Sequence, residues 1–138
     1  MTHLLDTVVL SEMRKRQGDP NVLRWLDGKA AELLFISTVT IGEIERGVET
    51  ARRRDPTFAE TLGLWLEELI DAYADRILPV DLVIARRWGQ LTARLGHAGI
   101  DLLIAATALE HGLTVATRNV RHFAPTGVAV ENPFEGAL

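Results

Sequence analysis

Residues 99–117, which read Gly-Ile-Asp-Leu-Leu-Ile-Ala-Ala-Thr-Ala-Leu-Glu-His-Gly-Leu-Thr-Val-Ala-Thr, decide the fold. The segment 100–110 is apolar on almost every side, which predicts a central buried helix, and Gly112 is placed to end it. The run 114–117 follows as a short apolar segment, the pattern of a buried parallel strand. A buried helix joined to a buried strand is typical of an α/β protein.

Four more short, unbroken apolar runs predict strands at residues 3–5, 33–37, 77–80 and 128–130. Apolar residues at helical spacing lie between them, over residues 41–51, 58–73 and 84–95. Thr38 or Thr40 is expected to cap the first of these helices, and Asp81 the third. Strands that alternate with helices predict an α/β fold: a three-layer α/β/α sandwich around a mainly parallel central sheet of about five strands. We expect a single domain over residues 1–138.

The composition limits the chemistry and the location of the protein. Apolar residues make up 47% of the chain and charged residues 25%, as in soluble globular proteins. The chain has no cysteine, which excludes disulfides, thiolate metal sites and cysteine nucleophiles. No basic segment precedes Leu4, and the longest apolar stretch, at 102–109, is too short to span a bilayer. We therefore expect a cytoplasmic protein without a signal peptide or a membrane partner. Because the net charge is −4, a nucleic acid would be attracted by local arginines or by a bound cation.

Four polar residues lie where predicted strands lead into helices. Asp6 directly follows the first strand, and Glu43 lies one turn into the helix after the second. Asp101 opens the buried helix, and Asn119 follows the strand at 114–117. In parallel α/β sheets the ligand site lies outside the carboxyl ends of the strands, so the predicted fold gathers these residues at one edge. This convergence is a stronger indication of function than any single motif.

Carboxylates and an amide oxygen are hard ligands that suit Mg²⁺ or Mn²⁺. A metal held by them can activate water for in-line hydrolysis of a phosphodiester. Asp6 and Asp101 are the expected principal metal ligands. Glu43 is expected to bind the metal directly, through water, or to orient the attacking water, and Asn119 to hold a metal-bound water or a substrate oxygen. Two threonines, Thr7 and Thr117, are expected to support this shell.

The same residues also have ordinary structural interpretations. Asp6 and Asp101 can be helix N-caps. Glu43 can be a solvated helix residue paired with Arg46 or Arg52, since such pairs are common and weak.

Asn119 can likewise be an ordinary turn residue. The histidines, His3, His97, His111 and His122, show no metal-ligand spacing, so none is assigned a role.

Three motifs in this order resemble those of a known family. They are Leu-Leu-Asp-Thr-Val-Val-Leu-Ser-Glu at 4–12, Ser-Thr-Val-Thr-Ile-Gly-Glu-Ile-Glu-Arg-Gly at 37–47, and Thr-Arg-Asn-Val-Arg-His-Phe at 117–123. Together with the stretch from Ile100 to Leu113, they resemble PIN-domain ribonucleases, and among these the VapC toxins of type II toxin–antitoxin pairs, in the FitB-like branch. The resemblance covers nearly the whole chain.

The resemblance implies a Mg²⁺- or Mn²⁺-dependent endoribonuclease that is usually a homodimer. It also implies a small cognate antitoxin, VapB- or FitA-like, that occupies the active-site groove and binds operator DNA. By motif position, the acidic residues of the family fall on Asp6, Glu43 and Asp101, and the fourth polar position falls on Asn119.

The chain departs from the family pattern in three places. Val8 stands where relatives usually carry an asparagine, and the segment before Asp101 is shorter than usual. His122 stands where some relatives have an aspartate. Val8 and the short segment before Asp101 motivate a second hypothesis, a catalytically weak PIN-fold binding module that still binds the antitoxin. A receiver domain is discarded because Asp6 has no acidic neighbour, and a dinucleotide enzyme because no Gly-x-Gly-x-x-Gly follows a strand.

Overall fold

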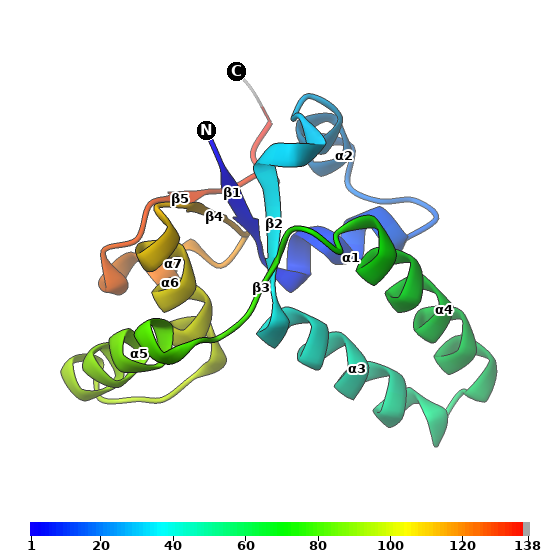
Figure 1. The fold of residues 1–138 in the computed structure, drawn as a ribbon. Coiled ribbons are helices and arrows are strands. Elements are labelled where there is room, and N and C mark those ends of the chain that lie inside the picture. The colour runs from blue at the N-terminus through cyan, green and yellow to red at the C-terminus, as the bar shows by residue number, and fades with distance from the viewer. Residues whose placement is uncertain (137–138) are drawn as a thin grey trace.

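A parallel sheet forms the centre of the molecule (Figure 1). The computed structural model describes residues 1–136, so the last two residues of the expected domain lie outside the described range. The sheet has five strands in the order β3-β2-β1-β4-β5, and every neighbouring pair is parallel. The strands are β1 (His3–Leu5), β2 (Leu34–Ser37), β3 (Ile77–Leu78), β4 (Thr114–Ala116) and β5 (Val130–Glu131). The predicted parallel sheet is confirmed.

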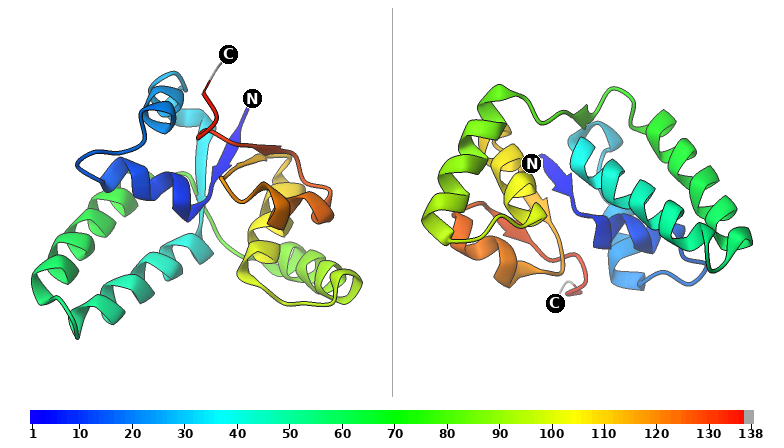
Figure 2. Two further views of the ribbon diagram at one scale, coloured as in Figure 1. Left: turned by 180° about the vertical axis from the view of Figure 1, so that it is seen from behind. Right: turned by 90° about the horizontal axis from the view of Figure 1, so that it is seen from below.

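Helices cover both faces of this sheet. They are α1 (Thr7–Arg14), α2 (Pro20–Asp27), α3 (Thr38–Arg52), α4 (Pro56–Ala72), α5 (Leu82–Leu95), α6 (Ile100–His111) and α7 (Val120–Phe123), with short 3₁₀ turns η1 (Ala31–Leu33) and η2 (Ala124–Thr126). Figure 2 shows the α3–α4 pair and the α5–α6 pair on opposite sides of the sheet.

Two separate hydrophobic cores establish the layers. Leu4 and Val115 pack into the core that α5, α6 and α7 close, while Leu5 and Ala116 pack into the core closed by α1 to α4. This reversal between neighbouring residues follows from the alternation of side chains along a strand. The predicted three-layer sandwich is therefore confirmed. Among the helices of residues 1–136, none has the length and apolar character needed to cross a membrane.

Most element boundaries agree with the predictions, and the differences have local causes. The strand predicted at 77–80 ends at Leu78, because Pro79 has no N–H to donate to a neighbouring strand. Neither Thr38 nor Thr40 caps α3; the Ser37 hydroxyl accepts the Val39 N–H at 3.0 Å instead. Asp81 caps α5 as predicted, accepting the Ile84 N–H at 2.9 Å.

Two further differences concern the ends of the chain. The last strand pairs from Val130 rather than from residue 128, since Val115 is opposite Val130 in the register, while Val128 is buried in the core before it. Helix α2 was not predicted; its N-cap Asp19 accepts the Asn21 N–H, and only Val22 of its residues is buried.

The topology determines where a ligand site can form. From β1 the chain moves outward to β2 and β3, then returns to β4 on the other side of β1. The strand order therefore reverses at β1, and ligands of open parallel sheets bind at this kind of reversal, outside the carboxyl ends of the strands. The segments that leave β1, β2 and β4 meet at this edge.

Candidate active site

Asp6 is the most deeply placed acid at this edge. It follows β1 directly, caps α1, and has only 4% of its surface exposed. One carboxylate oxygen, Oδ1, accepts the Thr7 N–H at 2.8 Å, and the other, Oδ2, accepts the Thr117 hydroxyl at 2.8 Å. Over residues 1–136 Asp6 belongs to no ion pair, although a buried carboxylate is costly without a compensating positive charge.

Glu43 comes from the second turn of α3 and is half-buried. Its Oε1 accepts the Thr7 hydroxyl at 3.0 Å, so Thr7 touches Asp6 through its backbone and Glu43 through its side chain. The alternative pairing of Glu43 with Arg52 is wrong, because Arg52 donates to Glu49 at 3.0 Å. Thr7 thus joins the two acids, which is the supporting position predicted for it.

Asp101 lies in the first turn of α6, with its side chain one-third exposed. Its alternative role as an N-cap is wrong, since Gly99 is the cap residue and makes no side-chain hydrogen bond. The short connection before it is a turn in which Gly96 has φ +78°, a left-handed conformation that favours glycine. Asp101 Oδ2 lies 3.0 Å from Nδ1 of His122.

His122 is the site residue that the sequence did not reveal. It comes from α7, 21 positions from Asp101, and its side chain is 63% exposed. The only available signal was its place in the third family motif, where some relatives carry an acid. The structure puts an imidazole at the Asp101 side of the acid cluster.

The charges of the three acids act on one another. Burial raises the pKa of Asp6, against the hydrogen bonds from Thr117 and Thr7, and the charge of Asp101 raises it further. Burial likewise raises the pKa of Glu43, with added repulsion from Asp6 and Asp101, while Arg46 lowers it. Asp6 and Glu43 are neighbours, since Thr7 hydrogen-bonds to both, and the charge of Asp101 acts on each of them from the first turn of α6.

Asn119 lies in the turn after β4. Its backbone N–H donates to the Thr117 hydroxyl at 3.0 Å, and it lines a hollow together with His122, the residue that contacts Asp101. Thr117 itself is fully buried and connects this turn to Asp6. Both supporting threonines therefore contact the acids, Thr7 through Glu43 and Asp6 and Thr117 through Asp6.

The donor set fits a hard divalent cation. Asp6 and Glu43 are carboxylates under mutual repulsion, and a cation between them would relieve it. Within the described chain no three acids or histidines close tightly enough to enclose a metal by themselves. Magnesium in proteins usually has one or two carboxylate ligands and keeps several waters, so an open arrangement of this kind suits it.

The chain belongs to the PIN domain family, whose sequence profile matches residues 3–127. It is 37% identical to the VapC ribonuclease Y4jK of Sinorhizobium fredii over 141 residues, which cover 97% of this chain and 99% of that protein. It is 36% identical to the toxin FitB of Neisseria gonorrhoeae over 138 residues, 95% of this chain and 97% of FitB. It is also 36% identical to the plasmid stability protein StbB of Pseudomonas syringae pv. tomato, over 96% of this chain and 98% of StbB.

Solved structures agree with this assignment. The crystal structure of FitAcB from Neisseria gonorrhoeae contains a chain that superposes with a TM-score of 0.85 at 36% identity, covering 97% of this chain and 99% of that one. The FitAB complex bound to an IR36 DNA fragment gives a TM-score of 0.84 at 34% identity, with 99% of both chains covered.

Proposed function

We propose that this protein is a metal-dependent endoribonuclease toxin that hydrolyses RNA phosphodiester bonds and is neutralised by a cognate antitoxin. The observation that carries the proposal is the buried, unpaired carboxylate of Asp6 beside Glu43 and Asp101 at the carboxyl edge of the sheet. The names of its relatives, a VapC ribonuclease and a toxin at more than a third identity over nearly full length, support the same activity.

Asp6, Asp101 and Glu43 would hold Mg²⁺ or Mn²⁺. When bound, the metal supplies Lewis acidity toward a phosphoryl oxygen and lowers the pKa of a coordinated water. Thr7 and Thr117 fix the carboxylates of Glu43 and Asp6 by donating their hydroxyl hydrogens to them.

The remaining polar groups act at the edge of this centre. His122, held against Asp101, restricts the orientation of that carboxylate. Asn119 is assigned to a substrate oxygen rather than to the metal, because its side chain lines the neighbouring hollow.

The partners are proposed from the same relatives. We assign RNA as the substrate and a small VapB- or FitA-like antitoxin as the inhibitor. The solved FitAB complex bound to DNA supports an antitoxin that also binds operator DNA. We also propose that the protein forms a homodimer. Leu64 on α4, with 61% of its surface exposed, and the exposed Leu23 on α2 provide apolar surface for the dimer contacts.

A catalytically weak binding module is the second candidate. It is favoured by Val8, two residues after Asp6, whose apolar side chain packs against the core. The two candidates differ in one measurable property, RNA cleavage that depends on a divalent metal.

The decisive experiment is incubation of single-stranded RNA with the purified protein, freed of antitoxin, in Mg²⁺, Mn²⁺ or EDTA. We expect cleavage with either metal and none with EDTA. If the RNA is equally intact in all lanes, with protein shown to be folded by circular dichroism, the nuclease activity is excluded and the binding module is supported. Val8→Asn is then the first variant to test for restored activity.

As the pH is lowered, RNA cleavage is expected to be lost at a higher pH than it would be if the metal ligands were ordinary exposed carboxylates. Metal ligands must be deprotonated, and burial raises the pKa of both Asp6 and Glu43. Metal affinity and cleavage are therefore present above these raised pKa values and lost as the pH falls through them. Manganese affinity measured against pH by calorimetry tests this.

Thr117→Val provides the matched control for this pH profile. It removes a hydrogen bond that lowers the pKa of Asp6, so the loss of affinity should move to still higher pH. A profile that does not move, in a variant that remains folded, would show that Asp6 does not control metal binding.

A further inference from the structure

We propose that a groove along α3 binds a single-stranded RNA and leads it into the acid site, an inference that rests on the proposed ribonuclease function. The groove has a volume of about 550 Å³ and is lined by Glu43, Arg46, Thr50, Arg54 and Phe58. It continues into a second hollow at the end of α3, which Arg46, Arg52, Arg53 and Arg54 line. One end is therefore an acid of the candidate active site, and the other is a cluster of arginines.

The spacing along α3 makes this groove continuous. Glu43, Arg46 and Thr50 are three or four residues apart on α3, so they follow one another on one side of the helix. Arg54, in the turn after α3, lines the same groove. From Glu43 to the end of α3 at Arg52 the helix rises roughly 14 Å, since each residue adds about 1.5 Å. Arg46 lies close enough to Glu43 to lower the pKa of that carboxyl. A phosphate held there would lie beside the metal-binding acids.

Across the groove and the second hollow four arginines line the surface together with three acids, Glu43, Glu49 and Asp55, whereas the whole chain carries a net charge of −4. In residues 1–136 no ion pair uses Arg46, Arg53 or Arg54, whereas Arg52 is held by Glu49. Besides Glu43, the lining acids are already engaged: Glu49 pairs with Arg52, and Asp55 is the N-cap of α4, accepting the Phe58 N–H at 3.1 Å. Available arginines favour phosphate, because their guanidinium groups match its geometry with two hydrogen bonds.

An exposed aromatic ring indicates single-stranded rather than duplex RNA. Phe58 has 38% of its surface exposed in the groove, and the Arg14 guanidinium lies 5.3 Å from the centre of its ring. Grooves that bind single strands combine arginines with aromatic side chains on which unpaired bases stack. Bases inside an A-form duplex are not available for such stacking.

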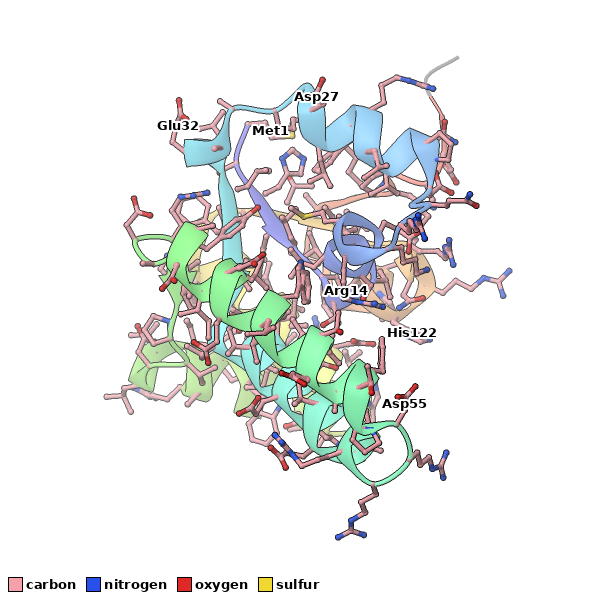
Figure 3. All side chains as sticks on the ribbon, turned by 90° about the vertical axis from the view of Figure 1, so that its right-hand side faces the viewer. Met1, Arg14, Asp27, Glu32, Asp55 and His122 are labelled. Carbon is pink, nitrogen blue, oxygen red and sulfur yellow. The ribbon has the colours of Figure 1, made fainter. Side chains whose placement is uncertain are left out.

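The groove and the acid site open in the same direction. In Figure 3 the labelled residues Arg14, His122 and Asp55 follow one another down the same side of the molecule. His122 contacts Asp101 of the acid site, while Arg14 and Asp55 flank the ring of Phe58 and the start of α4. An extended strand can therefore contact both without passing around the molecule.

The test is the salt dependence of RNA binding, measured in EDTA by fluorescence anisotropy with a labelled single-stranded oligonucleotide. Each phosphate contact to a single strand contributes about 0.7 to the slope of log affinity against log salt. Arg46→Ala/Arg54→Ala is expected to reduce the slope by about 1.4 and to weaken binding for every RNA sequence tested. The matched control, Arg24→Ala/Arg86→Ala, removes the same charge from exposed positions on α2 and α5 and should leave the slope unchanged.

Phe58→Ala tests the stacking separately. It is expected to weaken binding by about five- to a hundredfold without changing the salt slope, and Phe58→Tyr should restore affinity.

The outcomes separate this inference from the proposed function, because cleavage is measured in parallel samples with metal. If the wild-type protein cleaves RNA but Arg46→Ala/Arg54→Ala leaves the salt slope of RNA binding unchanged, the RNA-binding groove is overturned and the nuclease activity stands. If RNA binding depends on these arginines but no RNA is cleaved, the groove stands and the nuclease activity is overturned. Normal RNA binding with lost affinity for the antitoxin overturns the groove in favour of a protein-binding surface.

Discussion

Asp6→Asn is expected to lower metal-dependent RNA cleavage by at least about a thousandfold while the protein stays folded. The reason is that a bound metal contributes several kcal/mol of transition-state stabilisation, and about 1.4 kcal/mol corresponds to a factor of ten in rate. The amide has nearly the same shape as the carboxylate, so one oxygen can still accept the Thr7 N–H. Rates on a labelled RNA with saturating Mn²⁺ measure the effect.

The thermal stability of the same variant provides the control. In the metal-free protein the pKa of Asp6 is raised by burial, so its charged form is disfavoured in the folded state relative to the unfolded state. Stability from this group is present at low pH and decreases as the pH rises through the raised pKa. Removal of the charge should therefore raise Tm at neutral pH in EDTA. A lowered Tm together with lost activity would indicate misfolding instead, and cleavage at the wild-type rate would remove Asp6 from the mechanism.

Phe123→Ala is expected to destabilise the protein by about 3–5 kcal/mol, the usual cost of removing a buried phenylalanine ring. Phe123 is fully buried and anchors α7, the short helix that carries His122, to the core shared with α5 and α6. Since domains of this kind have a total stability of roughly 5–15 kcal/mol, this single change removes a large share of it. The urea midpoint of unfolding measures the loss.

Phe123→Leu is the matched variant for this prediction. It keeps most of the apolar volume, so the expected loss is about 1 kcal/mol. If Phe123→Ala costs no more than the leucine variant, then α7 is not held by this ring and its anchor lies elsewhere.

Much of the fold could be predicted because the apolar runs are short, unbroken and separated by helical stripes. The rule that parallel strands end at one edge was sufficient to bring Asp6, Glu43 and Asp101 together, although they lie up to 95 positions apart in the sequence. Helix α2 was missed although Val22, Trp25 and Leu26 form an apolar stripe that packs against the core. A helix of eight residues has about two turns, too few for that spacing to stand out in the sequence.

The rest of the site depends on side-chain directions that sequence patterns do not contain. The contact between His122 and Asp101 joins two helices, and neither residue has a partner at a regular spacing along its own helix. The turn after β4 is fixed by the Asn119 N–H, which donates to the Thr117 hydroxyl, a contact that the position of Asn119 after a strand does not predict. Strand order predicts which residues reach an edge, whereas the turn geometry decides which of them face the metal.

The central position of β1 has a consequence for the time at which the enzyme can first appear during synthesis. β1 is synthesised before both of its neighbours, β2 and β4, and β4 is complete only at Ala116. Contacts that close such long loops form late, because the chain loses the entropy of loop closure before it gains the free energy of the contact. The carboxylate of Asp6 therefore gains its contact with Thr117 only late, and a nascent chain that has not yet reached Thr117 carries no assembled active site.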